Sequence, residues 1–276
     1  MNAGIGRSAI QRSLLFVPGH RPDRFAKAVA SGAHQVILDL EDAVAPDSKR
    51  AARDAVADWL AAGGKGLVRI NAAETEWHKD DLLMLRSFPD AGAMLSKAEL
   101  ESLSVTLAEL PGQAVVALLE TVRGYTELPR LSQARGLSRI AFGSVDFGID
   151  SGIADEEGAM NSIRVEIVLQ SRAAGLPAPI DGVGIDFSDP NRMRAEALHS
   201  RRLGFGGKLC IHPAQVAVVN QAFQPSEQER EWARRVLAAF EASAGAATAL
   251  DGKMIDRPVV ERARRIASEF PAEPAA

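Results

Sequence analysis

The 276-residue sequence has a single cysteine, Cys210, and few aromatic residues. One cysteine excludes an internal disulfide framework and a zinc site built from several cysteines. Aromatic residues make up only 5% of the chain, which argues against stacking platforms for nucleic-acid bases. The net charge of −4 provides no excess of positive charge for binding nucleic acid or an anionic membrane. We therefore expect no nucleic-acid partner.

Long apolar runs are missing as well. No stretch approaches the roughly 20 apolar residues that a membrane-spanning helix needs. Residues 1–12 lack the hydrophobic centre of a secretory signal peptide. We therefore expect a cytoplasmic protein with no membrane partner.

Eight short apolar segments, most of them separated by segments with helical spacing, are the main pattern of the sequence. Continuous apolar strands separated by helices indicate parallel strands that are covered by helices. A doubly wound open sheet is the alternative, but no Gly-x-Gly-x-x-Gly motif opens a first helix. We predict an α/β fold, a (β/α)8 TIM barrel. The expected strands are residues 13–17, 35–40, 66–70, 93–95, 114–119, 139–142, 178–183 and 207–211.

The C-terminal part of the chain exceeds what a closed barrel needs. Ser226 and Glu229 have the spacing of a capping box, which predicts a helix over 226–242. A turn-rich stretch follows at 251–258, and a last helix is expected over 259–270. We predict a catalytic barrel domain over residues 1–225 and a C-terminal helical arm or lid over 226–276. The arm is either packing decoration or a segment that completes a neighbouring subunit's active site.

Charged residues stand at the downstream ends of the apolar segments. Glu120 directly follows 114–119, Asp146 comes shortly after 139–142, and Arg69 lies near the end of 66–70. The C-terminal ends of the strands form the mouth of a parallel barrel, where such folds keep their chemistry. Two carboxylates on successive strands can share one hard cation, and an arginine nearby can hold an anionic substrate.

Ordinary structural roles are open for the same residues. Glu120 and Asp146 can each cap a helix or pair with a surface lysine. Arg69 can form a structural ion pair with Glu41 or Asp42, and this pairing is compatible with a role in substrate binding.

The chain resembles the citrate lyase β-subunit family of the aldolase/citrate lyase superfamily, which includes malyl-, citramalyl- and related acyl-CoA lyases. The motifs that carry the resemblance occur in the same order over nearly the whole chain, at residues 12–19, 38–44, 68–71, 120–121, 143–147, 211–215 and 252–256. The resemblance implies a barrel assembled as a homo-oligomer (a trimer or hexamer), a Mg²⁺ site and an acyl-CoA substrate.

The resemblance also implies roles for single residues. Glu120 and Asp146 match the metal ligands, and Glu120 is also expected to contact substrate. Arg69 matches the substrate-binding and catalytic arginine, with Glu41 expected beside it or beside a water on the metal. Asp256 matches an acid/base that reaches the next subunit's active site, although an aspartate before Arg257-Pro258 is also a common helix cap.

Two further regions carry expectations, the residues that could contact the nucleotide and the loop after 93–95. Pro18 in the motif at 12–19 and Lys49 are candidates for binding the nucleotide end of a CoA thioester, and a solvated helix face is the alternative for Lys49. The chain has Leu95-Ser96-Lys97 where the family usually has Leu-Pro-Lys. The lost proline puts in doubt the loop geometry there and the reach of Lys97.

The implied reaction is a Mg²⁺-dependent retro-aldol (Claisen-type) cleavage of a citramalyl-, malyl- or citryl-type 3-hydroxyacyl-CoA to acetyl-CoA and a keto acid. Arg69 would stabilise the enolate, and Asp256 would protonate its carbon. Three alternatives stay open: a citrate lyase β-subunit acting on citryl-acyl-carrier protein, an acyl-CoA thioesterase using the same site, and a non-catalytic barrel. The last predicts broken site residues, whereas Glu120, Asp146 and Arg69 are all present.

Overall fold

The computed structural model describes residues 11–243 and 245–269. The chain divides into two compact units, Met1–Phe223 and Gln224–Ala276. The change from one unit to the next therefore falls between residues 223 and 224, slightly before the boundary expected from the sequence.

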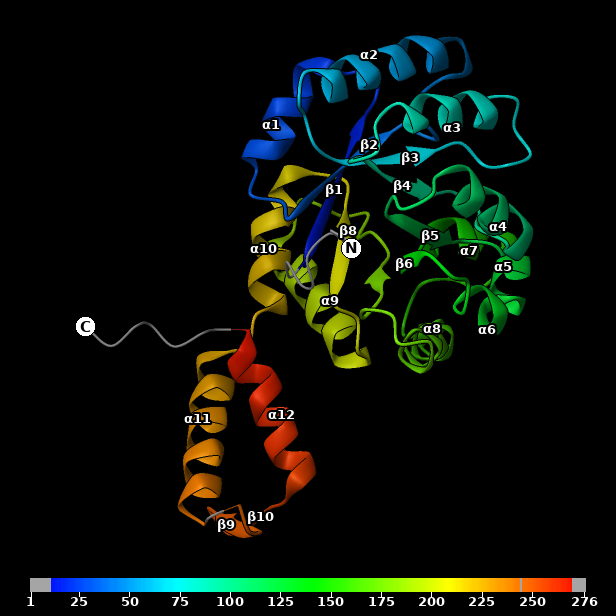
Figure 1. The fold of residues 1–276 in the computed structure, drawn as a ribbon. Helices are drawn as coiled ribbons and strands as arrows, with labels where there is room; N and C mark the ends of the chain where they lie inside the picture. Colours follow the sequence, from blue (N-terminus) through cyan, green and yellow to red (C-terminus); the bar gives the residue numbers. More distant parts are fainter. Residues whose placement is uncertain (1–10, 244, 270–276) are drawn as a thin grey trace. The chain divides into compact units, whose positions relative to one another are not determined.

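The first unit is a closed barrel of eight parallel strands in sequence order (Figure 1). The pairing of Leu14 in β1 with Leu209 in β8 closes the ring. This arrangement confirms the predicted (β/α)8 TIM barrel. The strands are β1 (Ser13–Pro18), β2 (Gln35–Asp39), β3 (Leu67–Ile70), β4 (Gly92–Leu95), β5 (Val115–Leu119), β6 (Leu137–Phe142), β7 (Ile180–Asp181) and β8 (Gly207–Cys210). β7 is shorter than expected, and the residue before it, Pro179, has no N–H to donate to a strand ladder.

Helices surround the barrel strands (Figure 1). They are α1 (Phe25–Ala30), α2 (Lys49–Ala61), α3 (His78–Arg86), α4 (Leu100–Glu109), α5 (Val122–Thr126), α6 (Leu128–Leu131), α7 (Ser144–Ser151), α8 (Asn161–Ala173), α9 (Pro190–Leu203) and α10 (Pro213–Phe223), with 3-10 turns η1 (Pro22–Arg24) and η2 (Pro46–Ser48). Local sequence explains many of the ends. Asp189 caps α9 through the N–H groups of Asn191 and Arg192, and Gly204 ends it with a φ of 105°.

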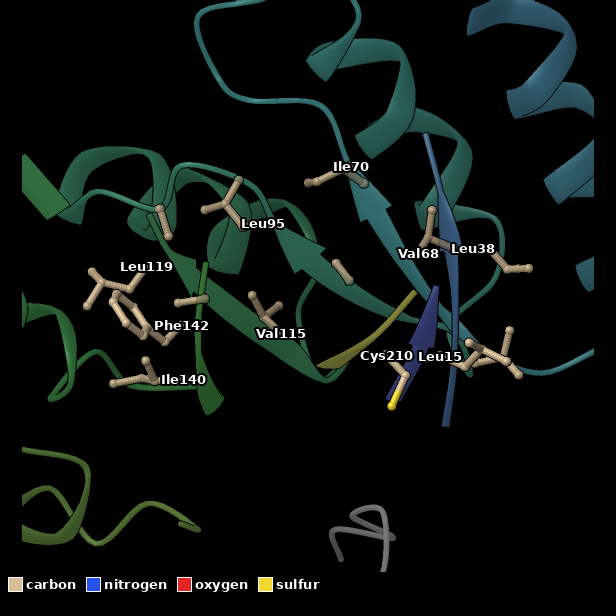
Figure 2. Close-up of a cluster of buried hydrophobic side chains, with 14 of the residues drawn as sticks. Leu15, Leu38, Val68, Ile70, Leu95, Val115, Leu119, Ile140, Phe142 and Cys210 are labelled. Atoms are coloured by element: carbon tan, nitrogen blue, oxygen red, sulfur yellow. The ribbon is translucent and has the colours of Figure 1, made fainter. Parts of the chain in front are cut away.

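Alternation along the strands produces two apolar layers. Every strand contributes to an inner cluster of Leu14, Ile37, Leu67, Met94, Val116, Leu118, Ala141, Ile180 and Leu209. The neighbouring positions belong to a larger cluster that includes buried residues of the surrounding helices. Figure 2 shows part of this outer layer, with Leu15, Leu38, Val68, Leu95, Leu119 and Phe142 on β1 to β6.

The second unit pairs two helices with a small hairpin. It consists of α11 (Glu227–Ala242), β9 (Thr248–Leu250), β10 (Lys253–Ile255) and α12 (Arg257–Ser268). The capping box between Ser226 and Glu229 is present. Asp251 and Gly252 turn the antiparallel hairpin with positive φ values of 50° and 73°. The unit has its own core of Ala233, Val236, Ile255, Val260, Ala263 and Ile266.

Across the described residues, no helix combines the length and apolar character needed to cross a membrane.

Candidate active site

Three charged side chains stand one inward position beyond the apolar lining of the barrel. Asp39 comes two residues after Ile37, Arg69 two after Leu67, and Glu120 two after Leu118. Because strand side chains alternate with a period of two, all three point to the inner side at the C-terminal ends of β2, β3 and β5. The alternation that builds the core therefore also brings these groups to the barrel mouth.

Arg69 lies at the centre of this charged group and is only 8% exposed. Its Nε and Nη2 atoms donate to the two oxygens of Asp39 at 2.7 and 2.6 Å, and Nη1 lies 2.9 Å from Oε2 of Glu41. The guanidinium also lies over the ring of Phe16, 4.7 Å from its centroid. Burial acts to lower the pKa of Arg69, but the carboxylates of Asp39 and Glu41 outweigh it and raise the pKa. The arginine is thus fixed as a cation in one orientation.

Asp39 was not among the predicted site residues. Besides holding Arg69, its carboxylate accepts the N–H groups of Glu41 at 2.9 Å and Ala43 at 3.3 Å. These bonds fold the loop after β2 back over the strand end. The inward position two residues after Ile37 is the sequence signal that identifies Asp39.

Glu41 lies two residues past the end of β2. Its two oxygens contact different cations: Oε2 contacts Arg69, and Oε1 lies 2.9 Å from Nζ of Lys97. Lys97 follows β4 and reaches the site despite the missing proline before it. Burial acts to lower the pKa of Lys97, but the hydrogen bond and charge of Glu41 outweigh it and raise the pKa.

Glu120 follows β5 directly and is 1% exposed. Its Oε1 accepts the main-chain N–H of Lys97 at 2.7 Å. Gly143 leaves room for it, since a Cβ at that position would lie 2.6 Å from both Cβ and Oε2 of Glu120. Burial, followed by the charge of Glu41, raises the pKa of Glu120 to about 8, and Asp146 contributes in the same direction.

Asp146 lies in the first turn of α7, which begins directly after β6. A carboxylate is favoured there by the helix dipole. Within residues 11–243 and 245–269, its carboxylate has neither a hydrogen-bond partner nor an ion-pair partner. Glu120 packs against Gly143, three residues before Asp146, and the charge of Asp146 contributes to the raised pKa of Glu120.

The charge balance of this group fits a divalent cation. Among the described residues, the carboxylates of Asp39, Glu41, Asp42, Glu120 and Asp146 outnumber the cations that interact with them, Arg69, Lys97 and Lys49. The described part of the chain has no group of three or more His, Cys, Asp or Glu side chains arranged to hold a metal. Two carboxylates with open positions for water and substrate oxygens are a typical donor set for Mg²⁺.

Lys49 does not occupy the position expected for a pyrophosphate contact. It begins α2 and is 6% exposed, and its Nζ donates to the carbonyls of Leu40 (2.7 Å) and Glu41 (2.8 Å) and to Oδ1 of Asn71 (2.6 Å). All three donors are used within the protein. The expectation that Lys49 binds the nucleotide end is therefore corrected: this lysine joins the loops after β2 and β3.

Two other predicted residues lie at element ends. Pro18 ends β1 and stands opposite Asp39 in the strand register, so it belongs to the same rim of the barrel. Asp256, in the second unit, is the N-cap of α12 and accepts the N–H of Val259 at 3.3 Å. The structure thus shows the capping role of Asp256, and its catalytic role stays a prediction.

A (β/α)8 barrel with an oriented arginine and facing carboxylates at its mouth is the architecture of a metal-assisted enzyme for small anionic substrates. Residues 12–213 match the family described as HpcH/HpaI aldolase/citrate lyase, and the chain belongs to this family. It is a carbon–carbon lyase by family membership.

Curated relatives match almost the full length. A citrate lyase subunit beta-like protein of Mycobacterium tuberculosis (strain H37Rv) is 38% identical over 256 residues, covering 90% of this chain and 92% of the relative. A (3S)-malyl-CoA thioesterase of Cereibacter sphaeroides is 32% identical, with 92% of each chain covered. An L-malyl-CoA/beta-methylmalyl-CoA lyase of Rhodobacter capsulatus is 32% identical, with 93% of each chain covered.

Among solved structures, CitE of Mycobacterium tuberculosis in complex with magnesium, acetoacetate and coenzyme A is similar to this chain with a TM-score of 0.82. The two are 35% identical, and the match covers 94% of this chain and 98% of that one.

Proposed function

We propose that the protein is a Mg²⁺-dependent lyase that cleaves a malyl-, citramalyl- or citryl-type 3-hydroxyacyl-CoA into acetyl-CoA and a keto acid. The observation that carries the proposal is that the barrel mouth holds two carboxylates, Glu120 packed against Gly143 and Asp146 in the helix turn that follows it, together with the oriented guanidinium of Arg69. The magnesium, acetoacetate and coenzyme A bound to the related CitE structure support the same choice of metal and substrate class.

Glu120 and Asp146 would hold the Mg²⁺. When bound, the ion would supply Lewis acidity that makes the substrate hydroxyl more acidic and polarises the carbonyl that forms from it. The fit rests on oxygen donors, on the excess negative charge, and on the Asp146 carboxylate that has no partner among the described residues.

Arg69 would stabilise the negative charge that develops during cleavage. Cleavage breaks the bond between the hydroxyl-bearing carbon and the carbon next to the thioester. The hydroxyl loses its proton to water and becomes the carbonyl of the keto acid, and the electrons of the broken bond pass to the thioester enolate. A fixed cation that needs no reorganisation stabilises such charge more than a mobile one. Asp39 fixes the guanidinium through two hydrogen bonds, so its orientation exists before substrate binds.

Asp256 would complete the reaction by donating a proton to the enolate carbon, which yields the methyl group of acetyl-CoA. It belongs to the second compact unit, and we propose that it serves the site of a neighbouring subunit in a homotrimer or hexamer. Pro18 at the rim is retained as a proposed contact for the nucleotide end of the CoA thioester.

Thioester hydrolysis is the second candidate, because a (3S)-malyl-CoA thioesterase is among the relatives at 32% identity. A citrate lyase β-subunit acting on citryl-acyl-carrier protein is the third, given the beta-like relative. One assay separates these functions. Malyl-, citramalyl- and citryl-CoA and citryl-acyl-carrier protein are each incubated with the protein, with and without Mg²⁺, and all products are identified by mass spectrometry.

The proposal expects acetyl-CoA and a keto acid in the presence of Mg²⁺ only. Free CoA together with the intact hydroxy acid would show the thioesterase instead. Inactivity on every CoA ester, with cleavage of the acyl-carrier-protein thioester, would show the citrate lyase subunit.

A further inference from the structure

Lys97 has an unusual main-chain conformation for its residue type. Its φ is 46°, in the left-handed region, where a side chain with a Cβ is strained. In the described part of the chain, Glu157 and Asp251 are the other non-glycine residues with positive φ. Such strain persists only where surrounding contacts fix the conformation.

Contacts on both sides of Lys97 supply that constraint. The hydroxyl of Ser96 donates to the carbonyl of Ile70 at 2.8 Å, and the N–H of Ala98 donates to the carbonyl of Leu118 at 3.0 Å. Ser96 thus ties the loop to β3 through a bond that proline, which lacks the hydroxyl, could not make. The loop after β4 is held between the ends of β3 and β5.

In this conformation Lys97 contacts two site carboxylates through different groups. Its main-chain N–H donates to Glu120 at 2.7 Å, and its Nζ lies 2.9 Å from Oε1 of Glu41. The opposite oxygen of Glu41 faces Arg69. Glu41 therefore forms ion pairs with two cations, and Arg69 is not the only group that neutralises its charge.

This sharing bears on how much positive potential Arg69 offers to substrate. Asp39 already neutralises the guanidinium through a bidentate pair. Asp42 lies 3.5 Å from the same guanidinium. If Glu41 also relied on Arg69 alone, three carboxylates would face one cation, and the local potential at the barrel mouth would favour anions less. The ammonium of Lys97 compensates the negative charge of Glu41. Its side chain is 32% exposed, so it reaches the rim of the barrel.

We propose that Lys97 is a positioning residue whose ammonium neutralises Glu41, so that Arg69 keeps its positive potential for the anionic substrate. Its strained main chain separately orients Glu120. This inference rests on the proposed function. It predicts that the side chain and the main chain of one residue do different tasks, which substitutions can separate.

Lys97→Met removes the ammonium and keeps the main-chain N–H and most of the side-chain volume. We expect kcat for the best CoA ester to fall about tenfold or more, with the Mg²⁺ dissociation constant from calorimetry within about threefold of the original. Lys97→Arg should recover most of kcat because it restores the charge. Lys27→Met, at an exposed position on α1, is the matched control and should change neither quantity.

A double-mutant cycle with Glu41→Gln tests the mechanism itself. If Lys97 acts by neutralising Glu41, Lys97→Met should reduce kcat much less in the Glu41→Gln background than in the original protein. A purely structural role would instead lower the melting temperature of Lys97→Met and give equal effects in both backgrounds.

Three outcomes overturn the inference: kcat of Lys97→Met within about threefold of the original, additive effects in the cycle, or loss of Mg²⁺ binding in step with kcat. Failure of the proposed function looks different, because the original protein would then release no acetyl-CoA from any ester. In that case the affinity of each protein of the double-mutant cycle for oxaloacetate is measured in the presence of Mg²⁺. Equal affinities for the original and Lys97→Met proteins would overturn the inference there too.

Discussion

Asp39 and Arg69 form a buried two-point ion pair across neighbouring strands, with N–O distances of 2.7 and 2.6 Å. The two residues stand opposite each other in the register of β2 and β3, so the pair is set by the backbone of the barrel. Planar bidentate geometry fixes both the position and the rotation of the guanidinium. The pair therefore connects the stability of the barrel mouth with the orientation of its main cation.

The Asp39→Asn substitution should affect both properties. Asparagine keeps the size of the side chain but leaves Arg69 without its bidentate carboxylate partner in a buried place. We expect a loss of about 3 kcal/mol in unfolding free energy, at the low end for a broken buried pair because Glu41 remains. Denaturant titration measures this loss. We also expect kcat to fall about 10- to 100-fold, and an unchanged kcat would contradict the orienting role of Asp39.

The raised pKa of Glu120 predicts a pH dependence of the metal-free protein. Its pKa is 4.5 in the unfolded chain and about 8 in the folded one, so the folded state binds more protons between these values. Stability from this group is present below the unfolded pKa and is lost as the pH rises through about 8. The melting temperature of the Glu120→Gln protein, without metal, should therefore exceed that of the original at pH 8 to 9, by calorimetry.

The same pKa governs metal binding. Because Mg²⁺ needs the ionised carboxylate, its affinity should rise with pH up to about 8 and level off above it. The rise should approach about tenfold per pH unit well below the pKa. Calorimetry across this range checks the slope, and an affinity independent of pH would contradict a role for Glu120 as a ligand.

Gly143→Ala tests the packing that places Glu120. The added Cβ would approach Oε2 of Glu120 to 2.6 Å and force the carboxylate to move. We expect Mg²⁺ binding to weaken by about tenfold or more. Gly152→Ala is the matched control at the other end of α7: its φ of 73° strains the main chain, but nothing lies within 4 Å of the added atom. It should lower stability by about 1–2 kcal/mol and leave Mg²⁺ affinity unchanged.

Asp256 has a capping role that must be separated from catalysis. Asparagine caps helices about as well as aspartate but cannot supply a proton. Asp256→Asn should therefore keep the melting temperature and lose roughly 10²- to 10⁴-fold in kcat. Asp256→Ala should lower both the melting temperature and kcat.

Sharing of Asp256 between subunits is tested by mixing. Oligomers assembled from Asp256→Asn chains and Arg69→Ala chains should regain part of the activity that each variant lacks. If mixing restores none, Asp256 does not serve a neighbouring subunit.

Much of the barrel could be predicted because its signals are local. Short apolar runs and turn residues marked all eight strands, and the strand ends located Glu120 and Arg69. Helix α10 was not predicted between the last expected strand, 207–211, and the helix expected from 226, although Pro213 suits a first helical turn. The hairpin of β9 and β10 was seen only as turn-rich sequence, since its strands are three residues each.

The site was harder to predict where residues distant in sequence determine a role. A lysine at the start of a helix gives no sign in the sequence that its side chain is buried. The side chain of Lys49 is buried because Asn71 and two main-chain carbonyls accept hydrogen bonds from its ammonium. The contacts of Lys97 depend on a positive φ that sequence does not favour for lysine. Asp39, by contrast, was predictable from inward alternation alone.

The proposed function depends on one divalent cation held by Glu120 and Asp146 at the barrel mouth. The decisive experiment is a crystal structure of the protein with Mn²⁺, recorded with anomalous scattering. We expect a single anomalous peak within about 2.0–2.3 Å of one oxygen from each carboxylate. A peak elsewhere, or the two carboxylates pointing apart with no peak between them, would contradict it.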